Sequence, residues 1–173
     1  MHGRGPGCPT ASSLLLNTIT VVLFQPWPKL ASVALPPRLA QIVEVFLSSP
    51  KEFRVEALLD FAKRLPPLPQ ELAAHRDLLE QVQECQTPFF LASKVEDGKV
   101  RLFFDAPPES PTVRGYAGIL AAGLDGETPE AILDVDNDFY LNMGLEEVVT
   151  PLRLRGMGAI MFRLKRQVES LAA

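Results

Sequence analysis

The stretch FFLASKVEDGKVRLFF, residues 89 to 104, decides the fold of this chain. Two runs rich in aromatic and aliphatic residues, 89–95 and 100–104, stand on either side of the tetrapeptide EDGK. An Asp-Gly pair between two such runs is a strong signal for a tight hairpin turn, and the apolar residues of the second run alternate as on the buried face of a strand. We therefore predict an antiparallel hairpin whose turn lies at Asp97 and Gly98.

A third strand is predicted just upstream, at LEQVQ (residues 79–83), which places Cys85 in a loop between two strands. A loop held by a rigid sheet is a common carrier of reactive groups, so Cys85 is a candidate functional thiol. The alternative is a small buried core residue, because free cysteine is among the most buried residue types. Both interpretations stay open at this point.

Apolar residues three and four apart predict two helices before the hairpin. The first stripe consists of Leu39, Ile42, Val43, Phe46 and Leu47, and the second of Val55, Leu58, Leu59, Ala62 and Leu65. Between them, Ser49 is predicted to cap the second helix, with Pro50 in its first turn and Glu52 completing a capping box. The segment LPPLP (65–69) then ends the helical pair, because proline cannot continue a helix.

Helices are predicted again after the hairpin. Their starts are marked by a hydroxyl residue before proline, at Ser110-Pro111, Thr128-Pro129 and Thr150-Pro151. Asp136 is predicted to cap a short segment that closes at Gly144. The last helix has an apolar stripe formed by Leu154, Met157, Met161, Leu164, Val168 and Leu171. Its basic residues are expected to form a solvated face, with partner binding as the alternative: Arg153, Arg155, Arg163, Lys165 and Arg166.

The charge and cysteine content exclude several classes of function. The 173 residues are 47% hydrophobic and 22% charged, which suits one ordinary folded domain. A net charge of -4, from 17 basic and 21 acidic residues, gives no general attraction to nucleic acid or anionic membranes. Cys8 and Cys85 do not make a disulfide framework, and His2 and His75 lack partners at zinc-ligand spacing. We expect a cytoplasmic protein that binds neither nucleic acid nor membrane.

Residues 1–35 form an extension whose composition differs from the rest. No Asp or Glu occurs before Glu44, and the apolar run at 12–24 is too short and too polar for a spanning helix. Three interpretations stay open: a disordered tail, a transit or secretory leader, and a docked structural segment. A transit peptide would make the protein organelle-targeted instead of cytoplasmic. We assign residues 36–173 to the folded domain.

Familiar catalytic motifs are missing from the sequence. The glycines do not have the spacing of a phosphate-binding or dinucleotide loop, and there is no G-x-S-x-G elbow. A papain-like role for Cys85 would need His75 as its base, and no Cys-x-x-Cys pair exists. A single loop cysteine can still attack a persulfide on another protein, accept its outer sulfur and pass it on without a cofactor of its own.

Four segments, in order, resemble the SufE family of cysteine desulfurase activators. They are FAKRLPPLP (61–69), ECQTPFF (84–90), DAPPESPTVRGYAGIL (105–120) and VVTPLRLRGMGAI (148–160). They match the family's RLP break, its persulfide-accepting loop, its Asp-rich turn before an Arg-Gly helix, and its late T-P-x-R-x-x-G signature. The resemblance implies a single compact α+β domain, with a short three-stranded antiparallel sheet flanked by helices, similar to iron-sulfur scaffold proteins of the IscU type.

The resemblance implies that Cys85 is a sulfur acceptor. It would receive persulfide sulfur from a SufS-like cysteine desulfurase, stimulate that enzyme, and deliver the sulfur to a SufBCD-like iron-sulfur scaffold complex. Pyridoxal phosphate belongs to the desulfurase, so no cofactor or metal is expected on this chain. Two alternatives are kept: an adaptor module whose Cys85 is buried and inert, and an iron-sulfur scaffold completed by a partner's ligands.

The resemblance also implies roles for residues around the acceptor. Arg153 would tune the thiolate or support the loop, the alternative being a plain surface salt bridge. Glu84 and Gln86 flank the acceptor and would position it, and Glu109 and Arg114 belong to a segment associated with desulfurase docking. Glu84 stands where the family usually has glycine, and its charge should raise the pKa of the thiol slightly. With a proline at position 88 as well, the amplitude of loop movement is left open.

Overall fold

The computed structural model describes residues 35–173, so the predicted extension lies, except for Leu35, outside the described residues. The elements in chain order are α1 (Pro37–Ser48), α2 (Lys51–Arg64), α3 (Gln70–Ala74), the 3₁₀ helix η1 (Arg76–Leu78), β1 (Glu80–Gln81), β2 (Phe90–Glu96), β3 (Lys99–Asp105), α4 (Pro111–Leu124), α5 (Pro129–Leu133), the 3₁₀ helices η2 (Phe139–Met143) and η3 (Leu145–Glu147), and α6 (Pro151–Ala172). The predicted α+β class is confirmed.

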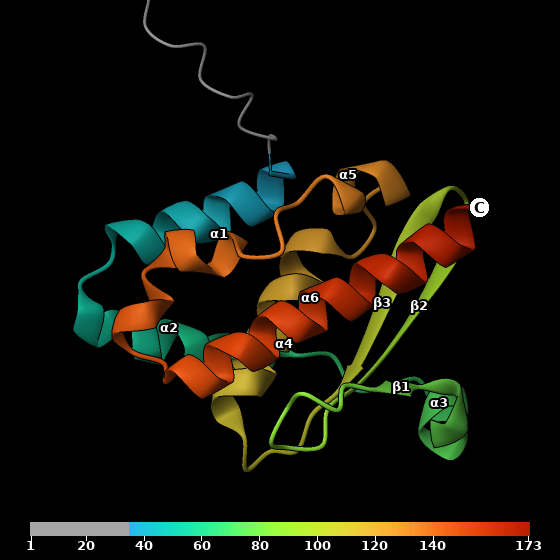
Figure 1. The fold of residues 1–173 in the computed structure, drawn as a ribbon, viewed down its shortest axis with the longest axis horizontal. Coiled ribbons are helices and arrows are strands. Elements are labelled where there is room, and N and C mark those ends of the chain that lie inside the picture. Colours follow the sequence, from blue (N-terminus) through green and yellow to red (C-terminus); the bar gives the residue numbers. More distant parts are fainter. Residues whose placement is uncertain (1–34) are drawn as a thin grey trace, which may run out of the picture. The chain divides into compact units, whose positions relative to one another are not determined.

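The sheet is antiparallel with strand order β1-β2-β3 (Figure 1). The predicted hairpin is confirmed, since Glu96 pairs with Lys99 and the two turn residues have positive φ, 52° at Asp97 and 73° at Gly98. Such values belong to the tight turns that match strand twist. The strand predicted at 79–83 is confirmed only over β1, because the chain leaves the sheet soon after the bond from Val82 N to Phe89 O.

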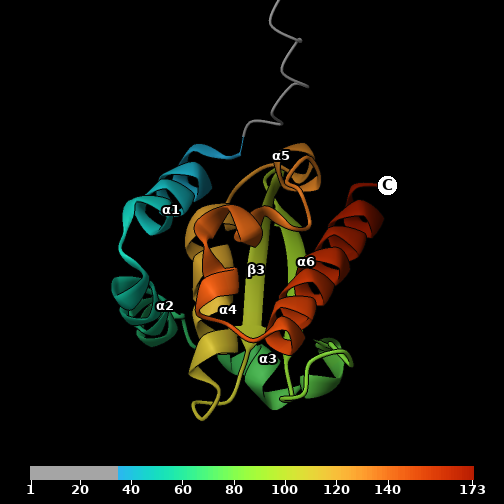
Figure 2. The same cartoon turned by 60° about the vertical axis from the view of Figure 1, so that its left-hand side comes forward.

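Helices α4 and α6 cover one face of the sheet, α4 over β3 and α6 over β2, and α1 and α2 pack against α4 (Figures 1 and 2). The alternation predicted for β3 is confirmed, because Val100, Leu102 and Phe104 are buried against these helices while Arg101 is exposed. This layer places the start of α6 beside the loop that joins β1 to β2.

The opposite face of the sheet is covered in part by α3 and η1, which the sequence did not predict. Arg76 of η1 forms an ion pair with Asp105 and lies over the ring of Phe90, 5.5 Å from its centroid. Glu71 of α3 lies 4.0 Å from the ammonium of Lys94 on β2. The five-residue helix follows the LPPLP break directly, so it is too short to show an apolar period.

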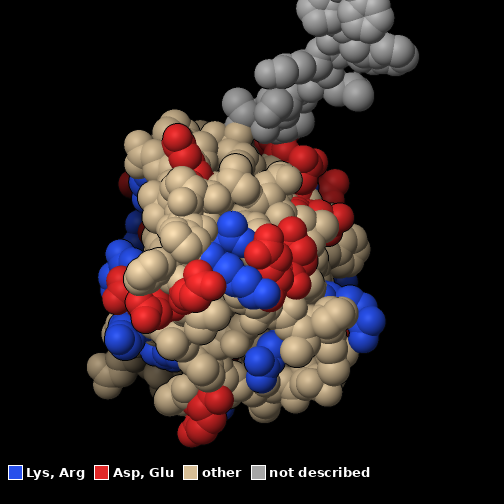
Figure 3. Space-filling model, turned by 90° about the vertical axis from the view of Figure 1, so that its left-hand side faces the viewer, with Lys and Arg blue, Asp and Glu red and all other residues tan. Residues whose placement is uncertain are grey.

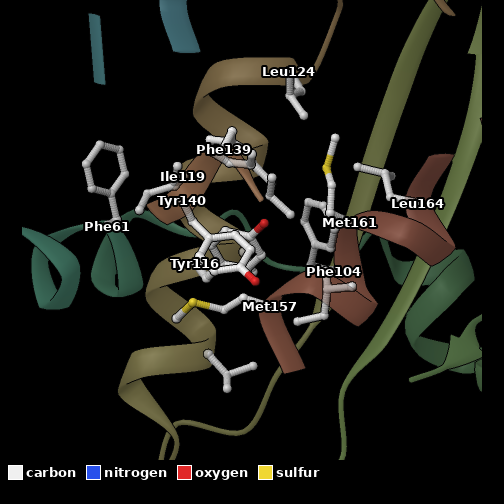
Figure 4. Close-up of a cluster of buried hydrophobic side chains, with 14 of the residues drawn as sticks. Phe61, Phe104, Tyr116, Ile119, Leu124, Phe139, Tyr140, Met157, Met161 and Leu164 are labelled. Carbon is white, nitrogen blue, oxygen red and sulfur yellow. The ribbon is translucent and has the colours of Figure 1, made fainter. Parts of the chain in front are cut away.

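The core lies between the sheet and the helices and centres on Tyr116 of α4. Figure 4 shows Tyr116 among Phe139, Tyr140 and Met157, and the rings of Tyr116 and Phe139 are stacked with centroids 6.0 Å apart. Within the described residues, no polar or charged residue other than tyrosine is buried in this core. Burial of a large apolar side chain contributes about 1.5–3 kcal/mol, so this layer supplies most of the stability.

Glycines on α4 allow a close contact between this helix and α2. A Cβ added to Gly118 would collide with the backbone carbonyl of Phe61 on α2, and one added to Gly115 would collide with the carbonyl of Leu58. The two helix backbones therefore approach each other in a way that no larger residue permits.

Two of the predicted helix ends are confirmed. The Thr128 hydroxyl caps α5 by accepting a hydrogen bond from Ala131 N at 3.3 Å, and Gly144 ends η2 with a left-handed φ of 66°. The start predicted for that short segment was wrong, because Asp138 instead of Asp136 is its N-cap residue.

Three predicted hydroxyl caps were wrong. Pro50 itself is the N-cap of α2, and the Ser49 hydroxyl donates back to Val45 O at 2.6 Å, so the capping box does not form. Ser110 and Thr150 are the N-cap residues of α4 and α6, but neither side chain bonds to its helix. The Ser110 hydroxyl donates instead to the hydroxyl of Thr87 in the β1–β2 loop.

The apolar stripes of α1 and α2 are narrower than predicted. Leu47, Val55 and Leu59 belong to the predicted stripes but are exposed, while Phe46 and Leu58 are buried. Figure 3 shows the face that carries these helices, on which basic and acidic side chains are interspersed. No helix among residues 35–173 is long and apolar enough to cross a membrane.

Candidate functional site

Cys85 lies in the loop between β1 and β2, as predicted. Its amide donates to Val82 O at 3.2 Å, and its thiol donates to the carbonyl oxygen of Gly156 on α6 at 3.8 Å. The side chain is half-buried beside a small cavity of about 60 Å³. The cavity is lined by Cys85, Gln86, Thr87, Ser110, Thr112, Val113, Leu152, Arg153 and Gly156. The thiol therefore lies beside a small, partly open cavity between the loop and the start of α6.

Gly156 makes room for the thiol. A Cβ added at this position would lie 3.3 Å from the Cys85 sulfur, a tighter contact than ordinary packing allows. Gly156 stands in the T-P-x-R-x-x-G segment of the sequence, but no role was predicted for it. The motif contains this glycine, but its role next to the thiol becomes clear only from the structure, in which α6 runs beneath the loop.

The surroundings keep the resting thiol protonated. Burial, and then the charge of Glu84, raise the pKa of Cys85 to about 11 from an ordinary value of 9.0, and Arg163 acts in the opposite direction. The predicted direction of the Glu84 effect is confirmed. Since the thiolate is the nucleophilic form, these surroundings lower the fraction of Cys85 that can react.

Glu84 is bound by Arg163 of α6. The guanidinium donates to both carboxylate oxygens of Glu84, from Nε at 3.0 Å and from the second terminal nitrogen at 2.9 Å. Its remaining terminal nitrogen donates to Glu80 on β1 at 2.7 Å. The Arg163 side chain is 18% exposed, so the prediction that it belongs to a solvated face was wrong. Its partners are 83 and 79 residues away in sequence, and no local pattern could have indicated them.

Glu80 has two further partners on α6. Arg166 forms an ion pair with it, and the side-chain amide of Gln167 donates to it at 2.9 Å. Gln167 in turn accepts from the hydroxyl of Ser93 on β2 at 2.9 Å. These contacts fix β1 and β2 to α6 independently of the loop that carries Cys85.

The other residues predicted for the site fall into two places. Gln86 and Arg153 line the cavity beside Cys85, whereas Glu109 and Arg114 line a neighbouring open groove together with Pro88. Thr87 and Ser110 line both, and the Ser110 hydroxyl donates to the Thr87 hydroxyl at 3.0 Å.

Arg153 and Arg114 differ in what holds them. Arg153 is exposed, and no described acidic residue forms an ion pair with it, so the salt-bridge alternative finds no partner in residues 35–173. Arg114 donates to Ala62 O at 3.0 Å and to Ala106 O at 2.8 Å, which fixes the end of α2 to the turn before α4. Their proposed roles toward the thiol and the desulfurase stay predictions.

A metal site is not formed by the described part of the chain. Residues 35–173 contain no group of three or more His, Cys, Asp or Glu side chains arranged to hold a metal ion. These residues alone therefore do not make the ligand set that the iron-sulfur scaffold alternative requires.

Comparison with known proteins places the chain in a family. Residues 40–168 match the SufE family, described as an Fe-S metabolism associated domain. The chain belongs to the SufE family, and it is similar to particular members over most of the domain. An uncharacterized SufE-like protein of Mycobacterium tuberculosis is 46% identical over 139 residues, which cover 80% of this chain and 96% of the relative.

A solved structure and a named relative support the same assignment. The solution structure of a hypothetical protein from Thermus thermophilus is 50% identical, with a TM-score of 0.73, and the match covers 80% of this chain and 98% of that one. The cysteine desulfuration protein SufE of Plasmodium falciparum is 29% identical over 136 residues, which cover 76% of this chain and 53% of the relative.

Proposed function

We propose that the protein accepts persulfide sulfur from a cysteine desulfurase on Cys85, stimulates that enzyme, and delivers the sulfur to an iron-sulfur cluster scaffold. Membership of the SufE family supports a role in sulfur transfer for iron-sulfur metabolism. The name of the Plasmodium relative, a cysteine desulfuration protein, supports a desulfurase as the partner. A SufS-like desulfurase and a SufBCD-like scaffold complex are the partners expected.

The observation that carries this proposal is the thiol beside its cavity. The cavity of about 60 Å³ next to the Cys85 sulfur exceeds the roughly 10–15 Å³ of such space that one water molecule needs, so it has room for one more sulfur atom. A persulfide formed on Cys85 can therefore be held under the loop without rearrangement of the core. Arg153 also lines this cavity, and Arg163 is the cation that lowers the pKa of the thiol, so we infer that arginines of α6 offset the negative charge of such a group.

The transfer step needs no cofactor on this chain. The Cys85 thiolate attacks the outer sulfur of a cysteine persulfide on the desulfurase, the S–S bond of that persulfide breaks, and the desulfurase cysteine leaves as a thiolate. The proton released by Cys85 neutralises the leaving thiolate, and the transferred sulfur keeps its oxidation state. Delivery repeats the step with a thiolate of the receiving protein. The pyridoxal phosphate that cleaves the C–S bond of cysteine belongs to the desulfurase.

We infer that the loop moves before the first step. With its pKa raised to about 11, Cys85 is almost entirely protonated near neutral pH. Movement of the loop away from α6 removes the burial that is the main cause of this shift, and the thiolate forms where the partner can reach it. A reducing compartment such as the cytoplasm keeps the thiol free between cycles.

The test is intact mass of the full chain after incubation with a SufS-type desulfurase and cysteine. The chain carries Cys8→Ser, so that Cys85 is its sole cysteine, and the control adds Cys85→Ser. We expect a gain of about 32 Da on the Cys85 peptide that is lost on treatment with a thiol reductant. The Cys85→Ser control should neither gain mass nor stimulate the desulfurase.

An unmodified Cys85 beside an active desulfurase would overturn the proposal and favour the adaptor alternative with an inert cysteine. A purified chain with visible iron-sulfur absorption bands would favour the scaffold alternative instead, with a partner or second copy supplying the missing ligands.

A further inference from the structure

We propose that Arg163 is a positioning residue for Cys85, and that its two hydrogen bonds to Glu84 form a latch that keeps the thiol loop closed on α6. This inference rests on the proposed function for its biological meaning, but the latch itself is a property of the free protein. We call the Glu84–Arg163 pair the latch.

The geometry of the pair is that of a strong directional contact. Both oxygens of the Glu84 carboxylate accept from one guanidinium, at 2.9 and 3.0 Å, and Glu84 is the residue directly before Cys85. A bidentate arginine-carboxylate pair fixes orientation as well as distance. The backbone at Glu84 therefore cannot leave α6, and carry Cys85 with it, while the latch is closed.

The contacts of Arg163 with the sheet hold it ready for this task. Glu80 on β1 accepts from the same guanidinium, and Arg166 and Gln167 also bind Glu80. The Arg163 side chain is 18% exposed, whereas that of Glu84 is 51% exposed. Arg163 is therefore held in place on α6 by Glu80, and Glu84 is the residue of the pair that can move away with the loop.

Arg163 makes two separate contacts: the one with Glu80 holds β1 on α6, and the one with Glu84 holds the thiol loop. Loss of the Glu84 contact leaves β1 fixed through Glu80, so the loop can open while the sheet stays in place. The remaining contacts that hold the loop are weaker: the 3.8 Å contact from the Cys85 thiol to Gly156, and the 3.0 Å bond between the Ser110 and Thr87 hydroxyls. The latch is the one charged contact among these three.

Glu84 and Arg163 could instead affect Cys85 only through their charges, and this alternative predicts different alkylation rates. Glu84 raises the pKa of the thiol and Arg163 lowers it. If these residues acted only through charge, Glu84→Gln would speed alkylation of Cys85, Arg163→Gln would slow it, and Arg163→Lys would leave it unchanged. If they form a latch, all three substitutions speed alkylation, because each one frees the loop.

The experiment measures the rate of Cys85 alkylation by iodoacetamide near neutral pH, by intact mass, in the full chain carrying Cys8→Ser. We expect about a fivefold increase for Glu84→Gln and a smaller increase of about threefold for Arg163→Gln, where the lost positive charge opposes the opening. Arg163→Lys should lie between wild type and Glu84→Gln. The matched control is Arg166→Gln, on the same helix and bound to Glu80 but not to Glu84, whose rate should stay within about twofold of wild type.

A slower or unchanged rate in both Arg163→Gln and Arg163→Lys would overturn the latch. If Arg163→Gln fails to fold, which thermal unfolding would reveal, the comparison of Arg163→Lys with wild type decides between latch and charge. The sulfur-transfer proposal is judged separately: a latch that fails while Cys85 still gains about 32 Da leaves the function standing, and the reverse result leaves the latch standing without it.

Discussion

The contact between α2 and α4 and the contact between the Cys85 loop and α6 both depend on a glycine, but they are built in opposite ways. At Gly118 two helix backbones touch, surrounded by buried apolar side chains. At Gly156 a half-buried loop touches α6 through one sulfur, Glu84 of the loop binds Arg163 of α6, and Thr87 bonds to Ser110 at the start of α4. The packing of α2 on α4 is the sum of many small apolar contacts and is lost only when the helices separate, whereas the few polar contacts of the loop can break individually. This difference supports the proposal that the loop opens while the core stays folded.

The largest expected effect is at the core contact. Gly118→Val would place three carbons against the backbone of Phe61, and we expect a loss of about 4 kcal/mol in the free energy of unfolding, at the upper end for single substitutions. Chemical denaturation measures it. The control is Ala122→Val, one turn further along α4 and exposed, which should cost well under about 1 kcal/mol. Equal losses in the two variants would show that the close approach of α2 and α4 does not matter.

The next effect concerns the thiol itself. A rise in pKa from 9.0 to about 11 predicts that Cys85 in the folded Cys8→Ser chain is alkylated about 100-fold more slowly near neutral pH than in the denatured chain, since each pKa unit is tenfold. The difference should narrow as the pH rises past about 11, leaving the part that is due to restricted access to the half-buried thiol. Rates that are equal in the folded and denatured chains would show that the loop does not protect the thiol.

The same shift has a consequence for stability, with a definite sign. Because the folded-state pKa is raised, the contribution of the protonated thiol is fully present below about pH 9 and is lost as the pH rises through about 11. Cys85→Ser should reduce the loss of stability over this range, which thermal unfolding measures, and the raised pKa values of Tyr116 and Tyr140 leave the remainder.

A smaller effect is expected where the loop meets α6. Gly156→Ala would place a methyl group 3.3 Å from the Cys85 sulfur, and the loop can yield by a few tenths of an ångström. We expect alkylation of Cys85 to rise about threefold with little loss of stability. Gly158→Ala is the matched control, because it gains the same helix propensity but contacts the Tyr140 hydroxyl instead. A parallel rise in both variants would attribute the effect to α6 as a whole.

The smallest effect is expected at the far end of the loop. Thr87→Val keeps the shape of the side chain but removes its hydrogen bond with Ser110. For a partly exposed neutral bond we expect about a twofold rise in the alkylation rate. A rise larger than that caused by Glu84→Gln would reverse the order of contacts and make Thr87 the principal restraint.

The features that were predicted correctly from the sequence depend on short stretches of neighbouring residues. The Asp97-Gly98 turn, the proline-marked starts of α4, α5 and α6, and the place of Cys85 between two strands all depend on residues close together in the chain. The wrong caps show the limit of this approach: Ser110 has the expected sequence, but its hydroxyl finds a better partner in Thr87.

What the sequence did not predict is contact between distant segments. Arg163 could not be separated from its basic neighbours on α6, because its distinction is that the fold brings Glu80 and Glu84 to it. The room at Gly156 is likewise defined by a loop 71 residues earlier. The thiol was found from sequence, and its restraints required the structure.

The positions of Gly156 and Arg163 on α6 constrain how this chain can change by insertion or deletion. Arg163 comes seven positions after Gly156 on one continuous helix, which places the two residues about two turns and about 10.5 Å apart on nearly the same side. One residue added or removed between them rotates one site by about 100° away from the loop, and no substitution within the loop restores it. Changes of length beyond Arg163 leave these two residues aligned, so the segment 156–163 of α6 sets the spacing between the two contacts with the thiol loop.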